Sequence, residues 1–113
     1  MTTPTLNKVL CIGTVIADPE IRFSGASQRP VSDIRFAVKH PGEEPLFLDV
    51  TAWGRQAESA VQHLRKGRMV AVEGRLTKDE WTGPDGRLHS RIRIVSDRLV
   101  YLPQPSDPIT QEA

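Results

Sequence analysis

The sequence lacks the features that mark secreted and membrane-bound proteins. It has one cysteine, Cys11, so no internal disulfide can form; the residue lies in the apolar run Val9–Ile12, where we expect a small buried side chain. No apolar run approaches the length of a bilayer-spanning helix, and the first residues, Met-Thr-Thr-Pro-Thr, lack the basic-then-apolar order of a secretory signal. These absences favour a cytoplasmic protein, and 113 residues suffice for one domain with a hydrophobic core.

Motifs for catalysis and metal binding are also missing. The three histidines, His40, His63 and His89, have no cysteine or carboxylate at metal-ligand spacing, and neither G-x-S-x-G nor a phosphate-binding P-loop occurs. An isolated surface histidine is usually only solvated. We therefore expect no enzyme, no metal and no cofactor, although residues distant in the sequence can still assemble a site.

Charge is nearly balanced over the whole chain, at +1, but it is unevenly distributed. Residues 1–54 carry five basic and six acidic side chains, for a net −1, and residues 55–98 carry ten basic and six acidic, for a net +4. The later part of the chain would attract an anionic polymer. A solvated surface can show the same imbalance, so charge alone identifies no partner.

The hydrophobic pattern predicts strands, one short helix and further strands. Two-residue alternation predicts strands over 9–17, 20–23, 33–39, 46–53, 69–78 and 88–102. Apolar residues at helical spacing between Ala57 and Leu64 predict a helix that ends with Arg65 and Lys66 before Gly67. Polar, turn-rich segments at 24–30, 40–45 and 82–86 are expected to be loops.

This order is that of an all-β domain. Counted as three strands before the helix and two after it, the pattern predicts a five-stranded OB-fold barrel with one short helix between strands 3 and 4, a partly open Greek-key barrel that often binds oligomeric ligands. Gly13 and Gly74 are suitably placed for the bends that such strands need. We expect the barrel domain to occupy residues 1–103 and the Pro-rich residues 104–113 to form a short disordered tail.

The strand 46–53 has two different faces. Leu48, Val50 and Ala52 form an aliphatic set that suits a core, and the opposite set combines the rings of Phe47 and Trp53 with Asp49 and Thr51. A buried face does not usually combine an unpaired carboxylate with aromatic rings. We therefore expect the two rings to be displayed, and we expect Arg35 on the preceding strand to pair with Asp49.

A third ring, Trp81, lies beside the predicted hairpin tip. Either it is displayed for binding, or it folds back onto the sheet as a cap. Basic residues lie near the rings in the sequence. On the last strand, one face carries Arg87, Arg91 and Arg93, and the other face, which we expect in the core, carries Leu88, Ile92 and Ile94. Rings that stack on bases, with cations that follow phosphates, are what sequence-tolerant binding of single strands requires.

Five segments in register resemble one family, the bacterial single-stranded DNA-binding proteins (SSB). They are Asn7-Lys-Val-Leu-Cys-Ile-Gly13, Ala17-Asp-Pro-Glu-Ile-Arg-Phe23, Phe47-Leu-Asp-Val-Thr-Ala-Trp-Gly54, Leu64-Arg-Lys-Gly67 and Val72-Glu-Gly-Arg-Leu76. The resemblance covers residues 6–102. It implies a non-catalytic OB-fold protein that binds single-stranded DNA in replication, recombination and repair.

The resemblance also implies site residues and an assembly. Rings at Phe47, Trp53 and Trp81 would stack on bases. Arg55 and Lys66 would lie near the DNA backbone, and we add Arg75 and Arg91 as further phosphate contacts. The family forms a homotetramer, a dimer of dimers, with the strand around Asn7–Leu10 at the dimer interface.

The chain departs from the family pattern at three places, the first being the short loop His40–Pro45, which lacks the further stacking ring found in some members. Asp79 and Glu80 stand where the family is commonly basic, and the sequence ends at Ala113 without the acidic C-terminal tip that recruits replication enzymes in other members. We therefore expect a short form, with recruitment through such a tip in doubt. The alternative function is an SSB-like protein-interaction module in a replication or repair assembly, with weak DNA binding.

Overall fold

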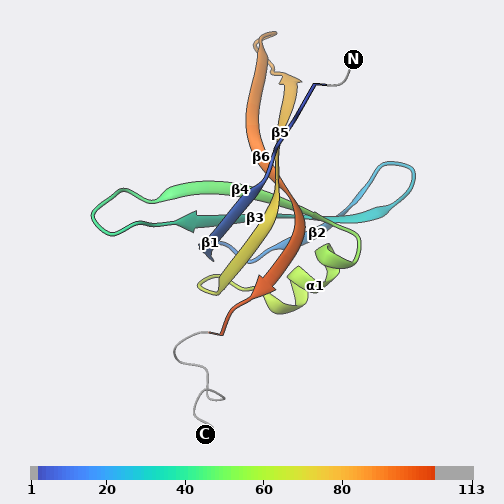
Figure 1. The fold of residues 1–113 in the computed structure, drawn as a ribbon. Helices are drawn as coiled ribbons and strands as arrows, with labels where there is room; N and C mark the ends of the chain where they lie inside the picture. The colour runs from blue at the N-terminus through green and yellow to red at the C-terminus, as the bar shows by residue number, and fades with distance from the viewer. Residues whose placement is uncertain (1–2, 104–113) are drawn as a thin grey trace, which may run out of the picture.

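The computed structural model describes residues 3–103, which form six strands and one helix (Figure 1). The strands are β1 (Val9–Val15), β2 (Glu20–Ser24), β3 (Arg29–Val38), β4 (Leu46–Trp53), β5 (Met69–Thr82) and β6 (Leu88–Tyr101), and the helix is α1 (Arg55–His63). Each expected strand is present, although β1 ends two residues earlier than predicted and β5 continues four residues further. Residues 104–113, expected to be disordered, lie outside the described residues.

Five of the strands close into a barrel. The sheet order is β1-β5-β6-β4-β3-β2, and an additional pairing of β1 with β3 joins its two sides. Neighbouring strands are antiparallel except β4 and β6, which run parallel at Val50 and Thr51. β2 pairs with β3 alone, so α1 lies between the third and fourth strands of the barrel proper, β4 and β5. The predicted OB-fold architecture is confirmed.

The core lies inside the barrel and under α1. Its largest buried side chains include Phe36, Ile34 and Ile94, each at most 1% exposed. The helix closes the barrel with Ala57 and Ala60, while Leu64 just beyond it is also fully buried. The helix ends at His63, so the prediction that Arg65 and Lys66 occupy its last turn is wrong: Leu64 has already left the helical conformation, with φ −101° and ψ 138°.

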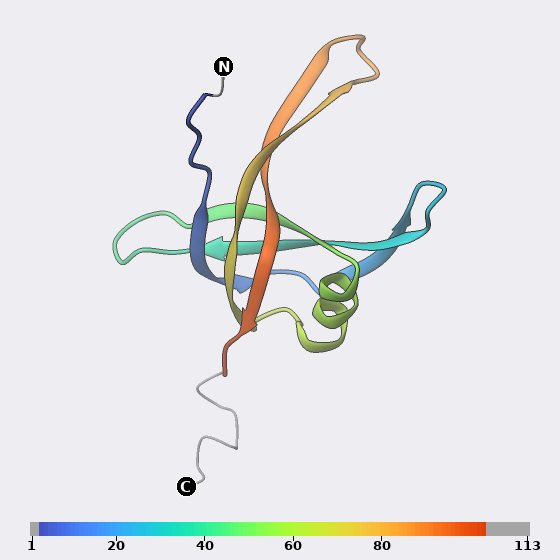
Figure 2. The same cartoon turned by 45° about the vertical axis from the view of Figure 1, so that its right-hand side comes forward.

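β5 and β6 continue past the barrel as a projecting hairpin, which we call the β5–β6 arm (residues 77–93; Figure 2). The register of β5 and β6 shifts between Glu73 and Gly74, opposite the segment Ser96–Arg98. The prediction that Leu88 and Ile92 face the core is wrong: they are 68% and 60% exposed. Both residues alternate in step with the buried Ile94, but among residues 3–103 β4 pairs with β6 only at Ile94 and Val95, so Leu88 and Ile92 lie beyond the end of the barrel.

Two smaller expectations are corrected on the N-terminal side. Cys11 is only partly buried, at the edge of the core, and desolvation there raises the pKa of its thiol. The loop expected over 24–30 is shorter, because Arg29 and Pro30 already pair with β2. No helix in the described part of the chain is long and apolar enough to cross a membrane.

Candidate nucleic-acid interface

β4 carries the first two candidate rings on its outer face. Val50 and Ala52 are buried, while Phe47 is 51% exposed and Trp53 is half-buried. The predicted division of the strand into a core face and a displayed face is therefore confirmed. Thr51 is the exception, because it is only 3% exposed and its hydroxyl donates a 2.8 Å hydrogen bond to Asp33 on the neighbouring strand.

Trp81 lies on the β5–β6 arm and is 46% exposed. It is directly opposite His89 in the strand register, and the two rings stack with centroids 5.6 Å apart. The indole therefore packs against its own hairpin and does not fold back onto the barrel, which favours display over the capping alternative.

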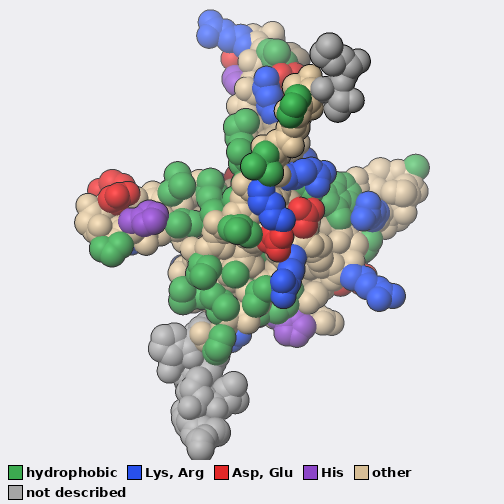
Figure 3. All heavy atoms as spheres, in the orientation of Figure 1, with side chains coloured by type: hydrophobic (Ala, Val, Ile, Leu, Met, Phe, Trp, Pro, Cys, Tyr) green, Lys and Arg blue, Asp and Glu red, His purple; other side chains and the backbone are tan. Residues whose placement is uncertain are grey.

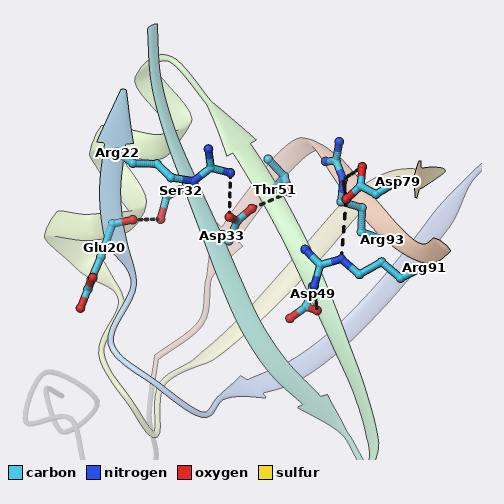
Figure 4. A network of polar contacts seen from close by, with 9 residues as sticks. All are labelled: Glu20, Arg22, Ser32, Asp33, Asp49, Thr51, Asp79, Arg91 and Arg93. Carbon is cyan, nitrogen blue, oxygen red and sulfur yellow. Dashed lines mark hydrogen bonds and ion pairs between the residues drawn. The ribbon is translucent and has the colours of Figure 1, made fainter. Parts of the chain in front are cut away.

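A ladder of ion pairs connects the arm to β4 (Figure 4). Arg93 Nε donates to both carboxylate oxygens of Asp79 at 2.7 Å, and Arg91 Nε lies 3.6 Å from the same carboxylate. Arg91 Nη1 also donates to Asp49 of β4 at 3.3 Å. Because Asp79 shares a strand face with Trp81 and Asp49 shares one with Phe47, the ladder joins the ring-bearing surfaces of the arm and the barrel.

The expected partner of Asp49 is also confirmed. Arg35 stands directly opposite it on β3, with Nη1 3.8 Å from Oδ1. Asp49, with a side chain 25% exposed, thus serves two guanidinium groups at once. Its charge is neutralised within the chain, so it does not stand as an unpaired carboxylate beside the rings.

A second pair extends the polar face to β2. Arg22 Nη2 donates to Asp33 Oδ2 at 2.8 Å, and Thr51 donates to the other oxygen. Partial burial raises the pKa of Asp33, but the hydrogen bonds from Arg22 and Thr51 outweigh it, so the pKa lies below its usual value. In Figure 4 these groups lie beside the ladder, across β2, β3 and β4.

The four predicted phosphate contacts fall into two groups. Arg75 lies 3.6 Å from Asp97, and Arg91 belongs to the ladder, so both already have carboxylate partners. Arg55, at the start of α1, and Lys66, after the helix, are exposed, and no carboxylate pairs with either side chain within residues 3–103. The backbone N–H of Lys66 donates to Asp18 at 2.8 Å, which joins the segment after α1 to the connection between β1 and β2.

A planar nitrogen-bearing side chain covers one side of each candidate ring. The guanidinium of Arg29 lies 5.3 Å from the Trp53 centroid, that of Arg35 lies 5.9 Å from the Phe47 centroid, and the imidazole of His89 stacks on Trp81. Sequence reasoning missed Arg29 and His89, and it assigned Arg35 to Asp49 alone and not to the ring of Phe47. Cross-strand register is the signal that finds them, since Arg35 and His89 sit opposite or beside the rings in the ladder.

A separate apolar groove of about 670 Å³ lies over β1, β5 and β6, at the ends of β3 and β4. Its walls include Leu10, 71% exposed, Ile12, 54% exposed, and Leu46, 57% exposed. Figure 3 shows hydrophobic side chains gathered on this face of the molecule. Just before β1, the side-chain amide of Asn7 exchanges two hydrogen bonds with the backbone of Leu76, at 2.8 and 3.0 Å.

Within residues 3–103, no three His, Cys, Asp or Glu side chains come together in a way that could hold a metal ion. The ring-bearing face offers aromatic rings for stacking and guanidinium groups for charge pairing. Both suit a flexible polyanion with exposed aromatic bases.

Known proteins resemble this chain over most of its length. The model of the single-strand binding protein family matches residues 6–102. A protein of Helicobacter hepaticus named single-stranded DNA-binding protein is 38% identical over 103 residues, which cover 85% of this chain and 61% of the relative. Proteins of the same name from Wolinella succinogenes and Aquifex aeolicus are 34% and 33% identical, with 85% and 88% of this chain covered and 64% and 72% of those relatives. The chain spans about three fifths of the length of the first of these relatives.

Proposed function

The chain belongs to the single-strand binding protein family, and from that premise we propose that it binds single-stranded DNA with little sequence preference and without catalysis. Bases would stack on Phe47, Trp53 and Trp81. Phosphates would contact Arg55, Lys66, Arg75 and Arg91. The protein would serve DNA replication, recombination and repair in the bacterial cytoplasm, in association with the nucleoid.

One observation carries this proposal: the rings on β4 and the ring on the arm belong to surfaces that the ion-pair ladder connects. A stacked base contributes roughly 1–3 kcal/mol, whichever base it is, because every base has a π-face. Duplex DNA hides those faces inside its base stack, so displayed rings favour single strands. Aromatic rings exposed to water on a charged surface are unfavourable unless they bind a partner.

The cations would contribute unequally. Arg55 and Lys66 can meet a phosphate directly, because no carboxylate of the described residues holds them. Arg75 and Arg91 must first exchange a carboxylate for a phosphate, which reduces their net gain. We therefore expect Arg55 and Lys66 to account for more of the salt dependence than the other two.

The acidic pair Asp79-Glu80 does not oppose DNA binding and so does not favour the alternative of a protein-interaction module. Asp79 is neutralised by Arg93 and Arg91, and Glu80 lies 2.8 Å from Lys78. Both carboxylates thus have partners within the arm, and neither offers a free negative charge to repel phosphates beside Trp81.

We further propose that the protein is a homotetramer, a dimer of dimers, with the strand around Asn7–Leu10 at the dimer interface. The exposed apolar side chains of β1 and the groove beside them support this assembly, since a monomer would leave them in water. Light scattering after gel filtration tests it: a mass four times that of the chain is expected, and a monomer would contradict it.

The experiment that tests DNA binding is a competition by fluorescence anisotropy. A labelled oligo-dT is bound to the protein, and unlabelled single-stranded or duplex DNA of the same length is added. Single strands of unrelated sequence should compete well and duplex poorly. Equal competition by duplex would contradict base stacking as the source of affinity.

A further inference from the structure

The imidazole of His89 lies behind Trp81 at the tip of the β5–β6 arm. By sequence it is an isolated surface histidine with no assigned role. In the fold it stands opposite Trp81 in the strand register, and the two rings stack 5.6 Å apart with their planes inclined by 20°. Stacking at this separation covers one face of the indole, and Trp81 as a whole is still 46% exposed.

The imidazole is held in this position by the loop that joins β5 to β6. His89 Nε2 lies 3.3 Å from Asp85 Oδ1, which also accepts the backbone N–H of Arg87 at 3.0 Å. The hydrogen bonds from Arg87 and from His89 together lower the pKa of the Asp85 carboxyl. Asp85 thus remains a charged acceptor that orients the ring.

Gly83 leaves the space that the imidazole occupies. A Cβ at this position would lie 2.7 Å from His89 Nε2 and 2.8 Å from Cδ2, closer than side chains approach one another. The loop is therefore shaped around the histidine ring. Three features, the stack, the carboxylate and the glycine, all place one imidazole against one indole.

We propose that His89 is a positioning residue for single-stranded DNA binding: it supports the indole of Trp81 from behind, so that a base stacks on the open face. This rests on the proposed function. An exposed tryptophan on a projecting hairpin would otherwise sample several rotamers, and binding a base would have to restrict it. A ring that is already held has less freedom to lose when the base arrives.

The test compares variants of the whole chain by anisotropy of labelled oligo-dT at several salt concentrations. His89→Ala is expected to weaken binding by about three- to tenfold, the cost of ordering one side chain. His89→Phe should restore affinity, because a flat ring again supports the indole. The slope of log affinity against log salt should not change in either variant, because no phosphate contact is lost.

A matched control and two further variants sharpen the test. Ser90→Ala is a truncation one residue further on the same strand but on the opposite face of the arm, and it should bind as the wild type does. Gly83→Ala should weaken binding as His89→Ala does, because its Cβ displaces the imidazole. In the Trp81→Ala background, His89→Ala should have no further effect, since it acts through the indole.

The possible results separate this proposal from the function on which it rests. If the wild type does not bind oligo-dT, the proposed function fails and the role of His89 fails with it. If the wild type binds and His89→Ala binds equally well, the positioning role alone is overturned. If His89→Phe is as weak as His89→Ala and both reduce the salt slope, His89 acts as a cation toward phosphate and the proposal is wrong.

Discussion

Asp49 offers a sharp test of how charge is arranged on the ring-bearing face. Its carboxylate lies 3.8 Å from Arg35 and 3.3 Å from Arg91, so it occupies two guanidinium groups that a phosphate would otherwise engage. Replacing it by asparagine keeps the shape and removes the charge. We expect Asp49→Asn to bind single-stranded DNA more tightly at low salt, because Arg35 becomes available to phosphates.

The magnitude follows from the partners that remain. Arg91 still has Asp79 at 3.6 Å, so the substitution releases about one arginine, and the slope of log affinity against log salt should steepen by about 0.7. The same change removes two ion pairs whose arginines are about half exposed, each worth roughly 0.2–1 kcal/mol. The free energy of unfolding should therefore fall by about 0.4–2 kcal/mol.

The assay is a titration of labelled oligo-dT at four or more salt concentrations, with urea denaturation in parallel. Glu58→Gln is the control, because it makes the same charge change at an exposed position on α1. That control should leave the slope unchanged. The reasoning is refuted if Asp49→Asn binds more weakly at every salt concentration with an unaltered slope, since the carboxylate would then act by holding the arginines in place.

Three further predictions concern the rings, the barrel and pH. Phe47→Ala or Trp81→Ala should weaken oligo-dT binding by about 1–3 kcal/mol with little change in Tm, because both rings are about half exposed; unchanged affinity would remove that ring from the site. Gly13→Ala should lower the free energy of unfolding, measured in urea, by about 1–3 kcal/mol, because its Cβ would lie 2.4 Å from a ring carbon of Phe36. An unchanged urea midpoint of unfolding would contradict this close packing. The lowered pKa of Asp33 adds stability that is present above about pH 4 and is lost as the pH falls through that lowered pKa. In Asp33→Asn, the free energy of unfolding should therefore depend less steeply on pH at the acid end. A dependence as steep as that of the wild type would contradict this role of Asp33.

Local patterns predicted the parts of the fold that depend on neighbours in the sequence. Alternation along 46–53 identified the core and displayed faces of β4, because side chains on a strand point to opposite sides in turn. The same alternation placed Arg35 on the polar face of the preceding strand and so predicted its pairing with Asp49, although the exact register came from the structure. The helix was predicted from its apolar spacing, although its end lies earlier than expected.

Features that depend on distant segments were not predictable in this way. Strand alternation predicted that Leu88 and Ile92 face the core. Whether that face is covered depends on how far β4 pairs with β6, which the local sequence does not show. The pairing of Arg91 with Asp49 likewise requires the parallel contact between β4 and β6, which joins segments about forty residues apart. The local sequence around each residue holds no signal for such a pairing.

The central claim is that single-stranded bases stack on the displayed rings, and the two tryptophans, Trp53 and Trp81, report on it directly. The measurement is intrinsic tryptophan fluorescence during titration with oligo-dT at about 50 and about 200 mM salt. The account predicts saturable quenching at both concentrations, with weaker affinity at the higher one. Absence of quenching, together with no retardation of the oligonucleotide on a gel, would contradict it.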